Sequence, residues 1–464
     1  MAGPGITWKT SKNHLAQAAG EDLRVESLYL EFGSAAVILA LVGLLTHPDR
    51  RSALSFLLGV SAGLVGVQVF RIHVFTILAV IWLCLPGGAG NRSSARFLAP
   101  LGFAAVLFAS TALLGDLVNS PTLALQLLGL VGSAAIVVLR ASRKDAKAML
   151  WGLLVISTLG SAVGLLQVFK LVPSDLWHLQ ISAIGRPTGI YPEPDWLGMY
   201  AGIGVILSWR LALPRVAKVI FSLTNFMVLV LAMARASWVA LVGTLLLVAC
   251  VAVIYRGTHT AGPRLKGPRN GRLAAIAAAL LASAIALTAV PQLQEDLVRR
   301  ISTMIGTVQE DDISGQARIR QNDSLMSLAD TVPVYGHGIS AAGRVGAWGQ
   351  FEAVGEAQNN VASNWILGMW VDGAWFAVPL IAFLITLALI RIRTIPGQLL
   401  TFCLISSLFS NAVFFPITWL LVALAITAGQ RRQGTCAAEK ETANALAGGA
   451  EQGQHPHRAA VVQS

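Results

Sequence analysis

Long apolar runs separated by short polar turns fill the chain between about residues 28 and 430. Many of these runs approach 18 residues or more, which is about the length that an α-helix needs to cross a bilayer. We predict 13 spans, at Leu28 to Thr46, Ser52 to Val67, Val69 to Leu85, Phe97 to Gly115, Thr122 to Leu139, Ala148 to Phe169, Trp196 to Leu213, Val216 to Ala234, Ser237 to Tyr255, Leu273 to Pro291, Ile366 to Ile390, Gln398 to Phe409 and Ala412 to Thr427. The runs at 52–85 and after Gln398 each fit two short spans or one broken hairpin, so about 12–14 helices are expected.

Composition supports the same class. Of the 464 residues, 55% are apolar and only 12% are charged, against about 25% charged in soluble proteins. This excludes a soluble enzyme, a disordered protein and a nucleic-acid-binding domain. The four cysteines show no CxxC spacing, so no disulfide framework or zinc site is predicted. No cleavable signal peptide is recognisable in the polar first 27 residues.

The basic residues predict how the spans are oriented. Of the 34 Lys and Arg residues, 20 lie in one alternate set of loops and nine in the other. Lys and Arg concentrate in cytoplasmic loops, so the first set is predicted to be cytoplasmic, and the C-terminus with it. This rule also accounts for the net charge of +11 without a nucleic-acid partner. The side of the N-terminus depends on the exact number of spans and is left open.

The predicted organisation has three parts. Residues 1–27 are a polar N-terminal segment, residues 28–430 form a transmembrane domain, and residues 431–464 form a disordered cytoplasmic tail. The domain includes one long external loop, 292–365, and a loop of that length in a compact protein is usually functional. An amphipathic stretch at 297–305 fits a helix on the outer membrane surface, and a second helix is predicted from about Gly315 to Leu328.

Several motifs are missing from the sequence. It has no P-loop, no HExxH and no GxSxG. It also has no acidic pair beside a nucleotide fold, and no soluble domain large enough to bind a nucleotide sugar. ATP-driven transport by this chain alone is therefore not expected, and a glycosyltransferase of this build would need a lipid-linked donor.

Unusual polar residues gather on the predicted outer face. Arg186 leads into a proline-rich turn with Glu193 and Asp195, immediately before a span. Charges beside the membrane are costly if they are buried and unpaired, so these residues are candidates for function. A solvated loop stiffened by prolines is an equally good interpretation of the same residues.

Further candidates come from later turns and from the long loop. Arg235 sits between two spans with almost no loop, where it either snorkels to headgroups or binds a phosphate. The remaining candidates are Arg318 and Arg320 in the loop, His337 in a glycine-rich turn, Asn364 before a span and Asp372 within it. His337 is more often a loop residue than a base, and Asp372 could equally cap a broken helix.

Taken in order, these segments resemble the O-antigen ligase and O-antigen polymerase superfamily of bacterial envelope glycosyltransferases. The resemblance covers roughly Ala148 to Thr427. Its motifs are the turn from Arg186 to Asp195, the turn Arg235-Ala236-Ser237, Arg318 fifteen residues before Pro333-Val334-Tyr335-Gly336-His337-Gly338, and Ser363-Asn364 before a span with Asp372-Gly373. Ser363 stands where ligases of this family carry a His, and Glu193-Pro194 looks more like the polymerase branch.

The resemblance implies an all-α, GT-C-like polytopic membrane protein with one large external loop that contains helices. It implies transfer of a glycan from an undecaprenyl-diphosphate-type carrier to an acceptor hydroxyl, on the outer face of the cytoplasmic (inner) membrane of a bacterium. The reaction needs no metal and no cofactor, and polymerisation of a surface polysaccharide is favoured. In this scheme Arg235 and Arg318 bind the diphosphate with support from Arg186 and Arg320, and Glu193 is the base with Asp195 second. His337, Asn364 and Asp372 are support residues.

Two alternatives stay open. One is an O-antigen-type ligase that makes a single transfer to a lipid or protein acceptor. The other is a transporter or flippase of lipid-linked or anionic substrates, although no inverted repeat is recognisable. The expected partners are the lipid-diphosphate-linked glycan donor, a glycan or lipid acceptor and membrane lipids, with no nucleic acid.

Overall fold

The computed structural model describes residues 49–65, 67–86, 92–172, 186–256, 313–346, 349–351, 362 and 364–428. The predictions for segment 1–27, the spans 28–46 and 273–291, the amphipathic stretch 297–305 and the tail 431–464 lie outside these residues.

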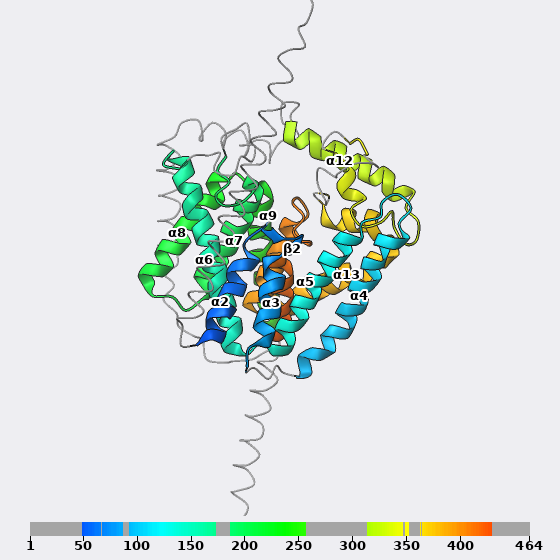
Figure 1. The fold of residues 1–464 in the computed structure, drawn as a ribbon. Coiled ribbons are helices and arrows are strands. Elements are labelled where there is room, and N and C mark those ends of the chain that lie inside the picture. Colours follow the sequence, from blue (N-terminus) through cyan, green and yellow to red (C-terminus); the bar gives the residue numbers. More distant parts are fainter. Residues whose placement is uncertain are drawn as a thin grey trace, which may run out of the picture.

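The described chain is mostly helical, as Figure 1 shows. Its helices are α2 (Arg50–Ala62), α3 (Val74–Cys84), α4 (Leu98–Leu114), α5 (Pro121–Arg140), α6 (Arg143–Val168), α7 (Pro194–Arg210), α8 (Arg215–Leu231), α9 (Arg235–Arg256), α12 (Ile313–Asp330), α13 (Trp365–Arg391), α14 (Ile395–Ser406) and α15 (Pro416–Ala428), with short 3-10 turns η1 (Arg92–Phe97) and η2 (Ala342–Arg344). Each predicted span within the described residues overlaps one of these helices. Five helices of the described part are long and apolar enough to cross a membrane: α5, α6, α9, α13, and α4 with its preceding turn.

Three other apolar helices, α2, α3 and α15, are shorter than predicted, whereas α14 has the predicted 12 residues. Helices α2, α3, α14 and α15 have 13, 11, 12 and 13 residues, so they extend only about 16–20 Å, against a hydrocarbon core of about 30 Å. Between α2 and α3 the chain forms a hairpin that the apolar pattern did not predict. Its strands β1 (Gln68–Val69) and β2 (Ile72–His73) pair antiparallel, with Val69 opposite Ile72.

Polar contacts gather at one end of the helices, called here the Asp145 end. Arg51 Nε bonds the Asp145 carboxylate at 3.2 Å, and Asp145 also closes the capping box that begins α6. The Arg51 guanidinium stacks 4.4 Å from the Trp82 ring centroid, and its Nη2 donates to the Arg140 carbonyl at 2.8 Å. Two loops that the charge pattern assigned to one side of the membrane, around Arg51 and at 140–145, therefore meet at one end of the protein.

Glycines let α2 lie directly on α6. A Cβ at Gly59 would lie 1.9 Å from the Met149 carbonyl oxygen, and one at Gly152 would lie 1.9 Å from the Phe56 carbonyl oxygen. Only a residue without a side chain permits such backbone approach. The last turn of α2 lies level with the middle of α6, because a Cβ at Gly63 would meet the Ile156 side chain at 2.4 Å.

Helix α13 is interrupted at Ala374, which has φ 42° and ψ −122°. The loop 333–338 fills this break. His337 N and Gly338 N donate to the carbonyls of Val371 and Asp372, both at 3.0 Å, and Trp375 N donates to the Val334 carbonyl at 3.2 Å. The loop thus satisfies backbone groups that the break removes from the helical pattern, and α12 lies above α13 at the end opposite Asp145 (Figure 1).

Candidate functional site

The end opposite Asp145 carries an ion cluster centred on the start of α7, called here the Asp195 cluster. Asp195 Oδ1 accepts from Arg186 Nη2 at 2.6 Å, and Asp195 Oδ2 accepts from Arg318 Nη2 at 2.6 Å. One carboxylate therefore joins two arginines that lie 132 positions apart in the sequence. The side chains of Arg186 and Asp195 are 9% and 14% exposed, whereas Arg318, on α12, is 32% exposed.

The local sequence explains why α7 begins here. Pro194 occupies the first helical position, where its missing N–H costs nothing. Asp195 lies in the first turn, where a negative charge interacts favourably with the helix dipole. Glu193 is the N-cap residue, but its side chain makes no capping hydrogen bond. Its carboxylate is thus not used to start the helix.

Packing fixes the loop that carries Arg186. Gln167, buried near the end of α6, accepts through Oε1 from Thr188 N at 3.0 Å and from Gly189 N at 2.7 Å. Gly189 has φ +61°, and a Cβ there would lie 2.5 Å from the Gly160 carbonyl oxygen. Tyr191, fully buried, stacks on Tyr200 with ring centroids 4.5 Å apart. The side chains that follow Arg186 are therefore held in one arrangement.

The turn between α8 and α9 belongs to the same region. The Ala232 carbonyl accepts from Arg186 Nε at 2.8 Å. A Cβ at Gly198 would lie 2.3 Å from the Ala234 Cβ, so this turn packs directly on the start of α7. Arg235, half-buried, is the first residue of α9. The structure thus brings the turn that carries Arg235 to the region of Arg186 and Asp195.

Glu193 lies solvent-accessible at the edge of this cluster. The surrounding protein partly desolvates the carboxyl, and this raises its pKa. The negative charge of Asp195 raises the pKa further. The positive charges of Arg318 and Arg186 oppose this shift without cancelling it. The pKa of Glu193 is therefore higher than that of an ordinary glutamate.

Arg320 occupies a different position. It is exposed on α12 two residues after Arg318, and two residues turn an α-helix by about 200°. The two side chains therefore leave the helix on nearly opposite faces. The backbone of α12 near Arg320 contacts segment 345–351, because a Cβ at Gly349 would lie 3.1 Å from the Arg320 carbonyl oxygen.

The three predicted support residues hold the surrounding fold. His337 is 3% exposed; its Nδ1 lies 2.8 Å from Asp116 Oδ1 and its Nε2 lies 3.2 Å from the Leu328 carbonyl oxygen. Asn364 Oδ1 caps α13 by accepting from Ile366 N and Leu367 N. Both side chains are engaged in structural contacts.

Asp372 also makes structural contacts. Its Oδ1 accepts from Ala342 N at 2.8 Å, and the side chain is buried. Asp372 thus anchors the loop that leads away from the His337 turn.

Sequence reasoning missed Gln167 and Asp116, which position Arg186 and His337 respectively. Gln167 could have been found from the sequence, because a polar residue in the last turn of an apolar span is a candidate for function. Asp116 has no comparable pattern around it, because its partner is 221 positions away.

No protein-family model matches this chain, and a search of curated proteins finds no significant relative. The motif-level resemblance and the geometry of the Asp195 cluster are therefore the observations that bear on function.

Proposed function

We propose that the protein is a membrane glycosyltransferase that uses a lipid-diphosphate-linked glycan as donor and polymerises a surface polysaccharide. The observation that carries this proposal is the Asp195 cluster. Two arginines from distant segments meet at one carboxylate, next to a second acidic residue with a raised pKa. The order and type of these residues match the motifs that resemble the O-antigen ligase and polymerase superfamily.

The arginines suit the leaving group of such a reaction. When the bond between the sugar and the lipid diphosphate breaks, negative charge accumulates on the diphosphate oxygens. A guanidinium offers five N–H donors in a planar fork that fits phosphate oxygens. Arg318 is partly exposed and donates to Asp195 through one nitrogen, so its fork can also reach a ligand. Arg235 would bind the same diphosphate with support from Arg186, whereas Arg320 leaves α12 on the opposite face from Arg318 and is not assigned to it.

Asp195 is better suited to positioning than to proton transfer. Both of its carboxylate oxygens accept hydrogen bonds from arginines at 2.6 Å. An oxygen held in this way is a poor acceptor for a further proton. Asp195 therefore orients the two guanidinium groups, and the role of second base is withdrawn from our proposal.

Glu193 remains the candidate base. In the proposed step the acceptor hydroxyl gives its proton to Glu193 while its oxygen forms a bond to the anomeric carbon. The bond from that carbon to the diphosphate breaks, and the electron pair leaves with the lipid diphosphate. A base works best with a pKa close to the operating pH, and the raised pKa of Glu193 moves it in that direction.

The test is transfer by the purified full-length protein in liposomes, supplied with a lipid-diphosphate-linked oligosaccharide and no nucleotide sugar. A ladder of longer glycans that disappears in Arg318→Ala would establish a polymerase. A single addition that requires a distinct acceptor would identify a ligase. Absence of transfer, with the donor instead crossing the bilayer, would refute the enzyme and favour a transporter.

A further inference from the structure

The turn of the hairpin between α2 and α3 has an unusual backbone for its residues. Phe70 and Arg71 have φ values of 50° and 64°, and they form a two-residue turn closed by the pair Val69–Ile72. Turns with positive φ at both central positions favour Asn-Gly, because a bulky side chain is strained there. Such strain persists where it serves a function or where the surrounding structure imposes it.

The strained turn presents its side chains outwards. Phe70 is 95% exposed, and the adjacent Val69 and Ile72 are 42% and 49% exposed. By contrast, Phe75, five residues later, is fully buried. Gln126 of α5 braces the turn by donating to the Arg71 carbonyl at 2.7 Å. The tip is therefore held in place while Phe70 and Arg71 project from it.

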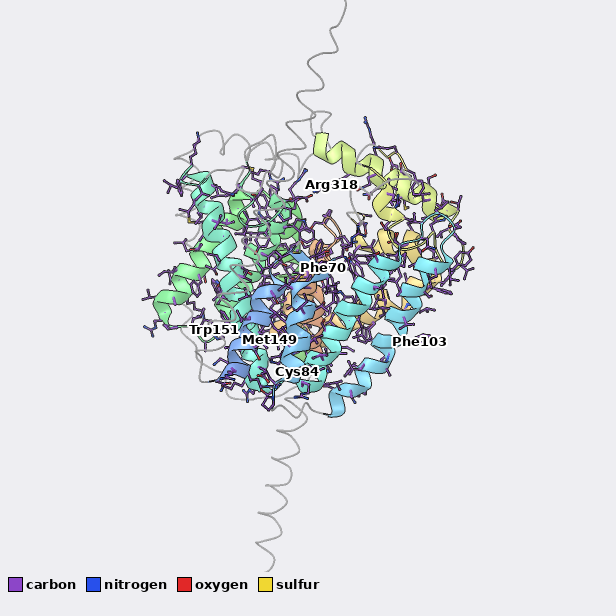
Figure 2. The ribbon with its side chains drawn as sticks, in the orientation of Figure 1. Phe70, Cys84, Phe103, Met149, Trp151 and Arg318 are labelled. Carbon is purple, nitrogen blue, oxygen red and sulfur yellow. The ribbon has the colours of Figure 1, made fainter. Side chains whose placement is uncertain are left out.

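The tip lies at membrane depth. Helix α5 has 20 residues, so it extends about 30 Å and matches the hydrocarbon core. The other end of α5, at Arg140, contacts Arg51 at the Asp145 end, and Gln126 is five residues from Pro121, where α5 begins. The braced tip thus lies about 8 Å inside that boundary. In Figure 2, Phe70 appears between Arg318 at one end and Cys84 at the other.

The brace by Gln126 suits this depth. Backbone groups within the hydrocarbon region must find partners in the protein, because water is scarce there. A Phe ring has no polar group, so at this depth it is stabilised by contact with lipid hydrocarbon. A long basic side chain can extend its charge from there to the headgroup phosphates. An adjacent Phe and Arg at such a depth therefore complement a lipid that has both a hydrocarbon chain and a phosphate.

We propose that the hairpin tip is a binding site for a phosphate-bearing lipid of the leaflet at the Asp195 end. Phe70 packs against the lipid chain, and the Arg71 guanidinium binds the phosphate. The lipid can be a phospholipid or the diphosphate-linked carrier, since both present the same chemistry. This inference does not depend on the proposed transfer activity, because the site requires only membrane insertion.

The test places a photo-reactive phenylalanine analogue at Phe70 in the full-length protein in native membranes. After irradiation, the lipid attached to the protein is identified by mass spectrometry. We expect a phosphate-bearing lipid, and the masses distinguish a phospholipid from a lipid diphosphate. Arg71→Ala should lower the yield of this adduct by about tenfold, as expected for loss of a charge-assisted hydrogen bond. Adducts only with phosphate-free lipids or with protein, or no dependence on Arg71, would overturn the proposal.

A matched variant separates binding from folding. The double substitution Phe70→Asn with Arg71→Gly supplies the residues that this turn geometry favours. Its melting temperature should be unchanged or higher than that of the wild type, because the backbone strain is relieved. With the photo-reactive group moved to Ile72, its phosphate-lipid adduct should be largely lost. An undiminished adduct in this well-folded variant would refute a role for the two side chains.

Discussion

Asp195 and Arg318 pair with each other, but removing Asp195 should lower the free energy of unfolding more than removing Arg318 does. Asp195→Ala leaves Arg186, which is only 9% exposed, without its carboxylate partner. Breaking a buried pair in this way typically costs about 3–5 kcal/mol, because the buried charge that remains loses its carboxylate partner. Arg318→Ala removes a residue that is 32% exposed and leaves Asp195 paired with Arg186. Solvent screens such a contact, so we expect a cost of only about 1 kcal/mol.

Thermal unfolding of the purified variants in detergent measures this difference. Asp195→Ala should show a clearly lower melting temperature than Arg318→Ala, while both should lose glycan transfer. Arg320→Ala is the matched control for Arg318→Ala, because it removes an exposed arginine from the same helix. Its melting temperature should stay close to that of the wild type.

The double variant Arg186→Ala with Asp195→Ala tests whether the buried charge of Arg186 causes the instability of Asp195→Ala. Removing both partners also removes the buried guanidinium charge that has lost its carboxylate, so this variant should be more stable than Asp195→Ala alone. Equal melting temperatures for Asp195→Ala and Arg318→Ala, or no recovery in the double variant, would refute the reasoning from burial.

Further predictions concern proton transfer, backbone geometry and metal dependence. Because the pKa of Glu193 is raised, transfer should decline on acidification at a higher pH than an ordinary glutamate would give; a pH–rate profile tests this, and Glu193→Gln should abolish transfer at every pH. Gly189→Ala should destabilise the protein by about 1–3 kcal/mol, because it forces a side chain into a positive-φ position against Gly160. Gly132→Ala, where nothing lies within 4 Å of the new Cβ, should be neutral or stabilising in the same melting assay. Chelators should leave transfer unchanged, and a strict Mg²⁺ requirement would contradict a metal-free mechanism.

The apolar pattern predicted the helices well because burial in hydrocarbon and in the core both require apolar residues. It predicted their lengths poorly for α2 and α3. The sequence indicated a break between the spans 52–67 and 69–85, but the apolar run does not reveal that two paired strands occupy residues 68–73. The exposed Val69, Phe70 and Ile72 look the same in sequence as residues of a span.

The candidate site shows a similar limit. The sequence identified Arg186, Glu193, Asp195 and Arg318 by residue type and order, and three of them do meet in one ion cluster. Sequence spacing could not show which arginine reaches Asp195. Arg318 and Arg320 look equivalent in sequence, and only the helical geometry of α12 separates their directions.

The contact between Arg51 and Asp145 has a consequence for how the protein is made. The two residues are 94 positions apart, so at typical rates of synthesis roughly 5–20 s pass between their emergence from the ribosome. During that time α2, at 13 residues, is too short to cross the bilayer and lacks the helix on which Gly59 packs. We therefore expect α2 and α3 to wait beside the insertion machinery until α6 arrives. Substitution of Asp145 should prolong that stage of biogenesis.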